Sequence, residues 1–387
     1  MDVRVIVLVG TPADGENVFK TSAETVAGVP IAVFDVLGKP VFQRVLEQVS
    51  RWGVAATTLV TELSPAAADL FEKPAGVRHL TAGSGQLWRV AENAFGEHAQ
   101  AGADAVLVLR VGPYIELNAD ELVQFHVDQR NRVTPVVDAA GEPLPIFVLS
   151  ASRRNDAAFL FRHAMQQMRV SGASYSYKGY CNRLVDAADL RRLAVDGLLG
   201  HAGLDPVGHE LKPGVWVGEG ARIQRGARLL APAFIGRRAK VRAAAVVTRC
   251  SAIEHHSEVD CGTVIENSTV LPYSYVGAGL DANHTVLGLK HLSHLKRSVE
   301  IEISDPKLLG MRSTSAPVRT LASAIALTSF LPVQLLRGLF SSSKASEPTP
   351  CLPASLNAPE PELKPEIAGP DQDFSADLVV ARRYGDQ

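Results

Sequence analysis

The stretch VWVGEGARIQRGARLLAPAFIGRRAKVRAAAVVTRCSAIEHHSEVDCGTVIENSTVL, residues 215–271, repeats with a period of six residues. Ten apolar anchors follow one another at this spacing, and in nine cases a small residue stands two positions before the anchor. The anchors are Val217, Ile223, Leu229, Ile235, Val241, Val247, Ile253, Val259, Ile265 and Leu271. The period is typical of a chain that coils as a triangular prism, with one short strand per face and three hexads per turn. Each anchor is then predicted to point into the prism.

The prism is expected to span roughly residues 210–300, with about four turns between Val215 and Val286. The hexads fall out of phase near Tyr275 and Val276, where we expect a slip of the register. The run VEIEI, residues 299–303, is predicted to add one more strand as a cap.

The chain before the prism alternates between strand and helix patterns. Residues 3–9, 56–62 and 104–111 are short apolar runs, as in strands buried on both faces. Residues 41–52 and 85–100 have apolar side chains at helical spacing, and Asn118 is a candidate N-cap of a third helix. This alternation predicts an α/β region with a parallel sheet over residues 1–205.

This domain order, together with the segment LGKPVFQRVLEQVSRWGV at residues 37–54, resembles the sugar-nucleotide pyrophosphorylases. These nucleotidyltransferases join a sugar 1-phosphate to a nucleoside triphosphate and release pyrophosphate. The resemblance covers residues 3 to about 290. It implies an α/β fold in which a Rossmann-like nucleotidyltransferase domain precedes a left-handed parallel β-helix.

Four positions depart from what the resemblance implies for a catalyst. Such enzymes carry a glycine-rich loop after the first strand, where this chain has VGTPADG with Pro12. The family's lysine falls on Ile31, and its two Mg²⁺-binding aspartates fall on Gly112 and Arg183. Phosphoryl transfer depends on positioning and charge neutralisation, so we expect no catalytic residues, no metal site and a degenerate enzyme. In the alternative of an active enzyme, Mg²⁺ is required and a shifted alignment recruits Asp186.

Two sets of basic residues are candidates for binding a sugar phosphate or sugar nucleotide. Arg110 lies near the lost aspartate position at Gly112, and Arg183 occupies the other, where guanidinium groups are expected to bind phosphate in place of a metal. In the prism, residues three hexads apart lie above each other, which stacks Arg237 over His255 and Arg238 over His256. This corner is expected to attract anions, most strongly below neutral pH.

Composition and charge limit the functional classes. The formal net charge is −2, which does not favour binding to nucleic acid. Cys181, Cys250, Cys261 and Cys351 show no paired or metal-ligand spacing, and the N-terminus shows no signal peptide pattern. A cytoplasmic protein with free thiols is the expectation.

After the prism, residues 301–340 are expected to hold an apolar helical segment. Residues 320–336 carry no charge but are short for a membrane span, so the alternatives are a helix packed on the protein and contact with a membrane surface over 320–340. Residues 341–387 are predicted to be a disordered, proline-rich tail, since residues 348–370 contain seven prolines.

Three functions are compatible with these features. The first is a non-catalytic binding or regulatory subunit in nucleotide-sugar or surface-polysaccharide metabolism, acting with a partner enzyme. The second is an active sugar-1-phosphate nucleotidyltransferase with a remodelled site. The third is a hexapeptide-repeat acyltransferase, for which the candidate bases are His255, His256 and His284. A homo-oligomer formed through the β-helix is expected in each case.

Overall fold

The structure is a computed structural model, and it describes residues 1–10, 25–63, 74–151, 161–162 and 173–311. The described residues belong to one compact unit, and the predicted division near 205–210 falls inside it. The apolar stretch 320–336 and the tail 341–387 lie outside the described residues. Of the segment expected to be helical, residues 301–311 instead hold the end of one strand and a second strand.

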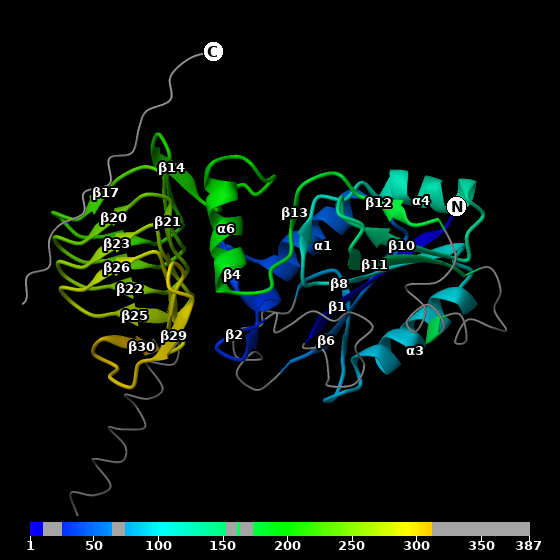
Figure 1. Ribbon diagram of the computed structural model, residues 1–387, viewed down its shortest axis with the longest axis horizontal. Helices are drawn as coiled ribbons and strands as arrows, with labels where there is room; N and C mark the ends of the chain where they lie inside the picture. Colours follow the sequence, from blue (N-terminus) through cyan, green and yellow to red (C-terminus); the bar gives the residue numbers. More distant parts are fainter. Residues whose placement is uncertain (11–24, 64–73, 152–160, 163–172, 312–387) are drawn as a thin grey trace, which may run out of the picture. The chain divides into compact units, whose positions relative to one another are not determined.

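The α/β region, residues 1–205, is built on a seven-stranded sheet (Figure 1). Strands β7, β6, β1 and β8 are parallel, while β11 is antiparallel to both β8 and β10. The predicted parallel sheet is therefore confirmed for its first four strands in sequence and corrected beyond them. The strand order is β12 (Tyr175–Ser176), β10 (Val133–Val137), β11 (Pro143–Ser150), β8 (Ala105–Arg110), β1 (Val3–Gly10), β6 (Ala56–Glu62) and β7 (Arg78–Thr81).

Helices cover both faces of this sheet. Helix α1 (Val41–Arg51) packs in the core that holds Val5, Val7 and Val9 of β1, whereas α3 (Leu87–Gln100) packs in the core that holds Ile6 and Leu8. The side chains of a strand alternate between faces, so β1 contributes to both cores. Helix α4 (Ala119–Asp128) begins at Asn118, whose side chain accepts the Asp120 N–H, as predicted. Helix α6 (Ala187–Leu198) follows.

Short elements complete the α/β region. They are the strand pairs β2 (Thr25–Val26) with β3 (Val29–Pro30), β4 (Asp35–Val36) with β5 (Lys39–Pro40) and β9 (Tyr114–Ile115) with β13 (Cys181–Asn182), and the 3₁₀ turn η1 (Ile31–Val33). The β4–β5 pair, which we call the junction hairpin, carries the Gly38-Lys39-Pro40 sequence.

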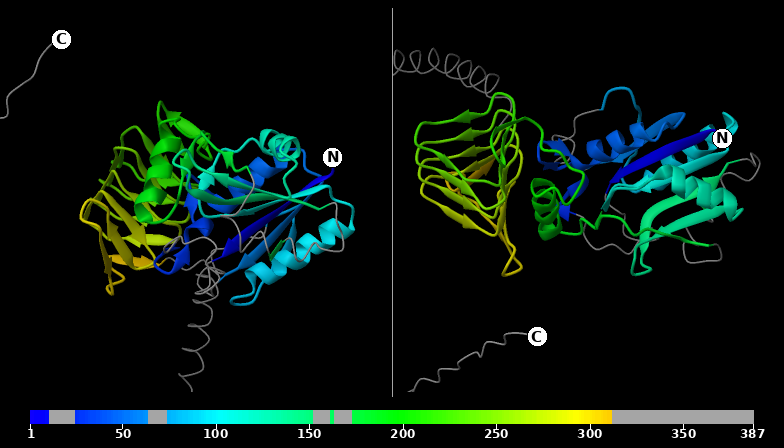
Figure 2. Two further views of the ribbon diagram at one scale, coloured as in Figure 1. Left: turned by 45° about the vertical axis from the view of Figure 1, so that its right-hand side comes forward. Right: turned by 90° about the horizontal axis from the view of Figure 1, so that it is seen from above.

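The hexad region, residues 215–288, forms three parallel sheets whose strands stack coil upon coil (Figures 1 and 2). The first sheet contains β15 (Val215–Val217), β18 (Ala233–Ile235), β21 (Ser251–Ile253), β24 (Thr269–Val270) and β27 (Thr285–Gly288). The second contains β16 (Arg222–Ile223), β19 (Lys240–Val241), β22 (Glu258–Val259) and β25 (Ser274–Val276). The third contains β17 (Arg228–Leu229), β20 (Val246–Thr248), β23 (Val264–Glu266) and β26 (Asp281–Asn283).

The predicted inward anchors are confirmed up to Ile265, since all nine belong to or pack against one core cluster. The tenth is wrong: Leu271 is buried in the core that the hexad region shares with the α/β region, and Val270 takes its place inside. The cause is a hexad that lacks one residue. Val246 pairs with Val264, three full hexads later, whereas Ala252 pairs with Thr269, one position short of three hexads. The register therefore slips between Glu266 and Thr269, before the expected position.

Antiparallel strands close both ends of the hexad region. β14 (His209–Lys212) pairs with β15, and β28 (His291–His294) pairs with β27 and with β29 (Val299–Glu302). The predicted cap strand at residues 299–303 is thus confirmed as β29. A further strand, β30 (Leu309–Met311), pairs with β25.

Candidate functional site

The carboxyl edge of the parallel strands is where ligands bind in open α/β sheets. Here the carboxylate of Glu62, the last residue of β6, accepts the N–H groups of Gly85 and Leu87 at 2.8 and 3.0 Å. These groups lie at the start of α3, and helix N-termini of this kind bind phosphate in nucleotide-binding folds. In this chain the carboxylate of Glu62 already accepts hydrogen bonds from these N–H groups.

The positions that the resemblance assigns to catalysis have other surroundings. Ile31 is 1% exposed in the core, and Gly112 is buried. Pro12 lies outside the described residues. Arg110 is buried at the end of β8, whereas the half-exposed Arg183 forms an ion pair with Asp138. The two arginines are engaged separately, and their role in phosphate binding stays a prediction.

Asp186 precedes helix α6, and its side chain caps the helix. Its Oδ1 accepts the N–H groups of Ala188 and Asp189, both at 2.9 Å, which makes it the N-cap. Mg²⁺ prefers several hard oxygen ligands. Within the described ranges, no three His, Cys, Asp or Glu side chains gather in an arrangement that would hold a metal. The Mg²⁺ requirement of an active enzyme stays a prediction.

The junction hairpin is one of the parts of the α/β region that meet the hexad region. Its central residues, Leu37 and Gly38, have φ values of 54° and 90°, as a two-residue turn with two positive φ angles requires. Leu37 is buried despite this unfavourable backbone, and a Cβ on Gly38 would approach Phe234 of β18 to 3.0 Å. The surrounding contacts hold the turn in this conformation.

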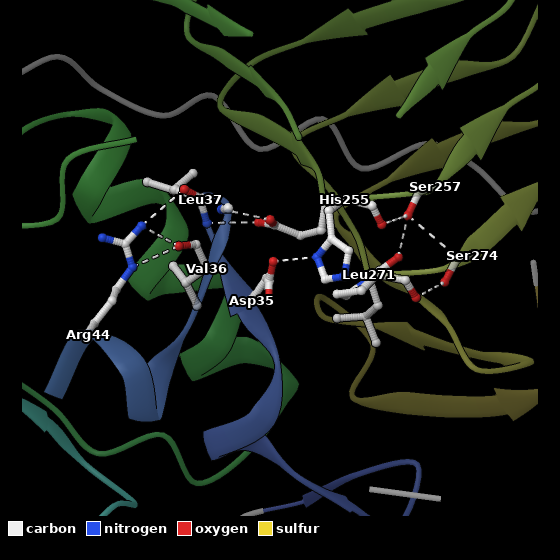
Figure 3. Close-up of polar contacts among 11 residues, drawn as sticks. Asp35, Val36, Leu37, Arg44, His255, Ser257, Leu271 and Ser274 are labelled. Carbon is white, nitrogen blue, oxygen red and sulfur yellow. Dashed lines mark hydrogen bonds and ion pairs between the residues drawn. The ribbon is translucent and has the colours of Figure 1, made fainter. Parts of the chain in front are cut away.

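Two buried ionisable side chains hold the hairpin, and Figure 3 shows the contacts of one of them, Arg44, with Val36 and Leu37. Arg44 of α1 donates to the carbonyls of Val36 and Leu37 at 2.6 and 3.0 Å. Glu254, which is 0% exposed and directly follows β21, accepts the N–H groups of Leu37 and Gly38, both at 2.9 Å. The turn is therefore clamped by charge-assisted hydrogen bonds to both its carbonyl and its N–H groups.

His255 forms the second contact between the two regions. Its Nδ1 lies 2.5 Å from Oδ2 of Asp35 in β4, and both side chains are largely buried. Burial acts to lower the pKa of His255, but the hydrogen bond to Asp35 and the charges of Asp35 and Glu254 outweigh it and raise that pKa. Burial, followed by the charge of Asp35, raises the pKa of Glu254 to about 7. Glu254 thus titrates near neutral pH, and His255 holds its proton more tightly than a free imidazole does.

The backbone brings the residues of the predicted basic corner onto adjacent turns, but their side chains have different surroundings. The His256 N–H donates to the Arg237 carbonyl at 2.9 Å, which stacks the two turns directly. His255 contacts Asp35, whereas the His256 ring stacks on Tyr273 at 5.0 Å. The Arg238 side chain lies over Gly220, where an added Cβ would come within 3.3 Å of its Cγ.

A cavity of about 310 Å³ opens beside the hairpin and the corner. It brings together two of the predicted residues, Arg237 and His255, but neither Arg238 nor His256 lines it. The remaining lining residues are Asp35, Gly38, Lys39, Pro40, Gln43, Val207, Gly218 and Glu219. Volume and polarity are those of a site for a small polar ligand.

His284, one of the candidate bases of an acyltransferase, makes a structural contact. Its Nδ1 contacts the side-chain amide of Asn267, the residue at the register slip. Arg191 of α6 donates to the Asn267 carbonyl at 3.1 Å and to its Oδ1 at 2.8 Å. The three residues tie α6 to the shortened hexad, and a role of His284 in acyl transfer stays a prediction.

Sequence reasoning missed the residues Asp35, Lys39, Gln43, Glu219 and Glu254. One signal was present: the positions directly after the anchors Val217 and Ile235 are Gly218 and Gly236, and a charged residue follows Ile253 at the same corner. A carboxylate at a corner where the preceding coils carry glycine indicates a contact made outside the prism.

Among the residues that the structure describes, no helix is long and apolar enough to cross a membrane. A scan of the sequence against protein-family models finds no match. A search of curated proteins finds no match either. The resemblance to sugar-nucleotide pyrophosphorylases therefore rests on the motifs and the domain order of this chain.

Proposed function

We propose that this protein is a catalytically degenerate relative of the sugar-nucleotide pyrophosphorylases. It acts as a binding or regulatory subunit in nucleotide-sugar or surface-polysaccharide metabolism. The hexad region is then a left-handed parallel β-helix, and the α/β region a Rossmann-like nucleotidyltransferase domain without turnover. The parallel pairing of strands that lie three hexads apart, or one position fewer, supports this architecture.

One observation carries the proposal: Glu62 fills the N-terminal N–H groups of α3 at the carboxyl edge of the sheet. Nucleotidyl transfer must hold a triphosphate, a metal and a sugar phosphate together, and this needs donors and metal ligands. A carboxylate in the donor position repels phosphate and leaves fewer N–H groups for it. The apolar Ile31 and the capping role of Asp186 act in the same direction.

The partners follow from this function as proposals. The ligand is a sugar phosphate or a sugar nucleotide, and the protein forms a homo-oligomer through the β-helix or associates with an active partner enzyme. The compartment is the cytoplasm, in keeping with Cys181, Cys250 and Cys261, which are free thiols. Residues 320–340 lie outside the described residues, and membrane-surface contact through them stays a prediction.

The test is release of pyrophosphate from each common nucleoside triphosphate with several sugar 1-phosphates, with and without Mg²⁺. We expect no release above the rate without protein. Mg²⁺-dependent release that Asp186→Asn abolishes would overturn the proposal. Asparagine keeps the N-cap of α6, so this variant removes the charge without unfolding the helix.

A further inference from the structure

The junction cavity, the 310 Å³ space beside the hairpin, is lined by side chains of both charges from two distant parts of the sequence. Lys39 and Asp35 come from the junction hairpin and Gln43 from α1, whereas Arg237 and Glu219 come from corners of the hexad region. His255 lies between the two groups. Cations suit a phosphate group, while carboxylates accept hydrogen bonds from hydroxyls and an amide both accepts and donates them.

The walls of the cavity are held in place before any ligand arrives. Arg44 and Glu254 hold the hairpin from both sides, and Asp35 orients the His255 ring through Nδ1. Lys39 lies 2.7 Å from Glu47 on α1, an ion pair that is about one-third exposed and open to exchange with a phosphate oxygen. A preorganised site of this kind costs little ordering free energy on binding.

We propose that the junction cavity binds the phosphate monoester of a polyhydroxylated molecule, with Lys39 and Arg237 on the phosphate and Asp35, Gln43 and Glu219 on the hydroxyls. The choice of a sugar phosphate rests on the proposed function, whereas the phosphate chemistry rests on the cavity alone. The site is separate from the carboxyl edge of the α/β sheet, so binding here requires no nucleotide and no metal.

Protonation of His255 strengthens binding, because the imidazolium adds a positive charge to the wall of the cavity. The charged and titratable groups around the ring are Asp35, Lys39, Glu219, Arg237, Glu254, His256 and Tyr273. Asp35 and Glu254 favour the charged ring, and Arg237 disfavours it. A phosphate monoester stays mostly dianionic above about pH 6.5. Affinity is therefore expected to fall as the pH rises from 6.5 to 8.5.

The experiment is isothermal titration of the full chain without Mg²⁺. The probes are glucose 1-phosphate, mannose 1-phosphate, inorganic phosphate and unphosphorylated glucose. We expect at least one sugar phosphate to bind about tenfold or more tightly than inorganic phosphate, and glucose to show no binding. The dissociation constant should rise about threefold or more between pH 6.5 and 8.5, and His255→Asn should make this rise smaller. Binding of inorganic phosphate equal to that of both sugar phosphates overturns the choice of ligand.

Matched arginine variants locate the ligand. Arg237→Gln should weaken binding about tenfold or more, whereas Arg222→Gln, an exposed arginine on β16 away from the cavity, should have no effect. Arg238 belongs to the predicted basic corner but does not line the cavity. If Arg238→Gln weakens binding as much as Arg237→Gln does, the proposal is overturned. Lys39→Gln is the second variant. If Lys39→Gln and Arg237→Gln both leave the affinity for the sugar phosphate unchanged, the proposal is also overturned. Pyrophosphate release would refute the proposed function without affecting the proposal for the junction cavity. Absence of phosphate binding would refute the proposal for the junction cavity without affecting the proposed function.

Discussion

The two halves of the hexad region reach the same triangular cross-section in different ways. In the first half a coil takes three full hexads, and the small position before each anchor is alanine, at Ala233, Ala239 and Ala245. In the second half each coil is one position shorter, and the stacked positions are Ser251, Ser257 and Thr263. The change from alanine to a hydroxyl thus coincides with the shortening of the coil.

The hydroxyl groups at the stacked positions of the second half make the same pair of hydrogen bonds. Each donates to a carbonyl of the next coil and accepts an N–H slightly farther along it, as Ser257 does with Leu271 at 2.7 Å and Ser274 at 3.4 Å (Figure 3). The same bonds recur at Ser251, Thr263 and Ser268. A shortened corner turns backbone groups toward the interior, where unpaired groups are costly. The hydroxyl satisfies them.

The irregular half also supplies contacts to the α/β region. The shortened hexad presents Asn267 to Arg191 of α6 and turns Leu271 into the core shared with the α/β region. Tyr273, at the next corner, packs edge-on against His255 at 4.8 Å. The full-length coils form the stacked sheets, and the shortened coils also contact the α/β region.

The largest effect is expected from a charge placed at an inner anchor of either half. Val247→Asp and Val270→Asp each bury an unpaired carboxylate, because both side chains are 0% exposed in the prism core. Each should destabilise the protein by several kcal/mol, measured by chemical denaturation. Gln224→Asp, at an exposed position of the same region, is the control. A Val270→Asp variant that unfolds like the control would show that the slip lies elsewhere and that Leu271 is the anchor.

An intermediate effect is expected at the hydroxyl positions. Ser257→Ala removes a donor from the Leu271 carbonyl and an acceptor from the Ser274 N–H, so it should cost about 1–3 kcal/mol of unfolding free energy. The reciprocal variant, Ala239→Ser, adds an oxygen at a fully buried position of a full-length coil and should also destabilise. A neutral Ser257→Ala would mean that the hydroxyls fill space without bridging the coils.

The sequence predicted the coils well because an inner anchor at every sixth position is a local property. It misplaced the slip because Val270 and Leu271 are both apolar and stand side by side, so either continues the pattern. Stacking of positions three hexads apart likewise brought Arg237 and His255 to one corner.

The rest of the candidate site depends on tertiary contacts. Asp35 pairs with His255, and Leu37 with Glu254, across more than half of the sequence. No periodicity in the chain relates them. The lysine of the Gly38-Lys39-Pro40 sequence was visible as a motif, but its place beside the hexad region follows from Glu254 and Phe234, which only the folded chain brings to the hairpin.

The smallest expected effect is a pH dependence of stability that originates in the second half, at Glu254 and His255. Both groups hold a proton more tightly in the folded state than in the unfolded one. For Glu254 the stabilisation is complete below the unfolded pKa of about 4.3 and is lost as the pH rises toward its folded pKa of about 7. For His255 it is complete below about pH 6.5 and is lost as the pH rises through its raised pKa.

Both contributions therefore have the same sign, and the wild type should lose stability from pH 5 to pH 8.5 relative to a variant without these groups. In the double variant Glu254→Gln, His255→Asn, the difference in unfolding free energy between the two pH values should shrink by on the order of 1 kcal/mol. Urea denaturation at both pH values measures it. His256→Asn is the matched control, because the neighbouring ring stacks on Tyr273, whereas it is His255 that contacts Asp35. If His256→Asn changes the pH dependence as much as the double variant does, the groups that bind the protons include His256. The two halves of the hexad region would then differ in packing alone.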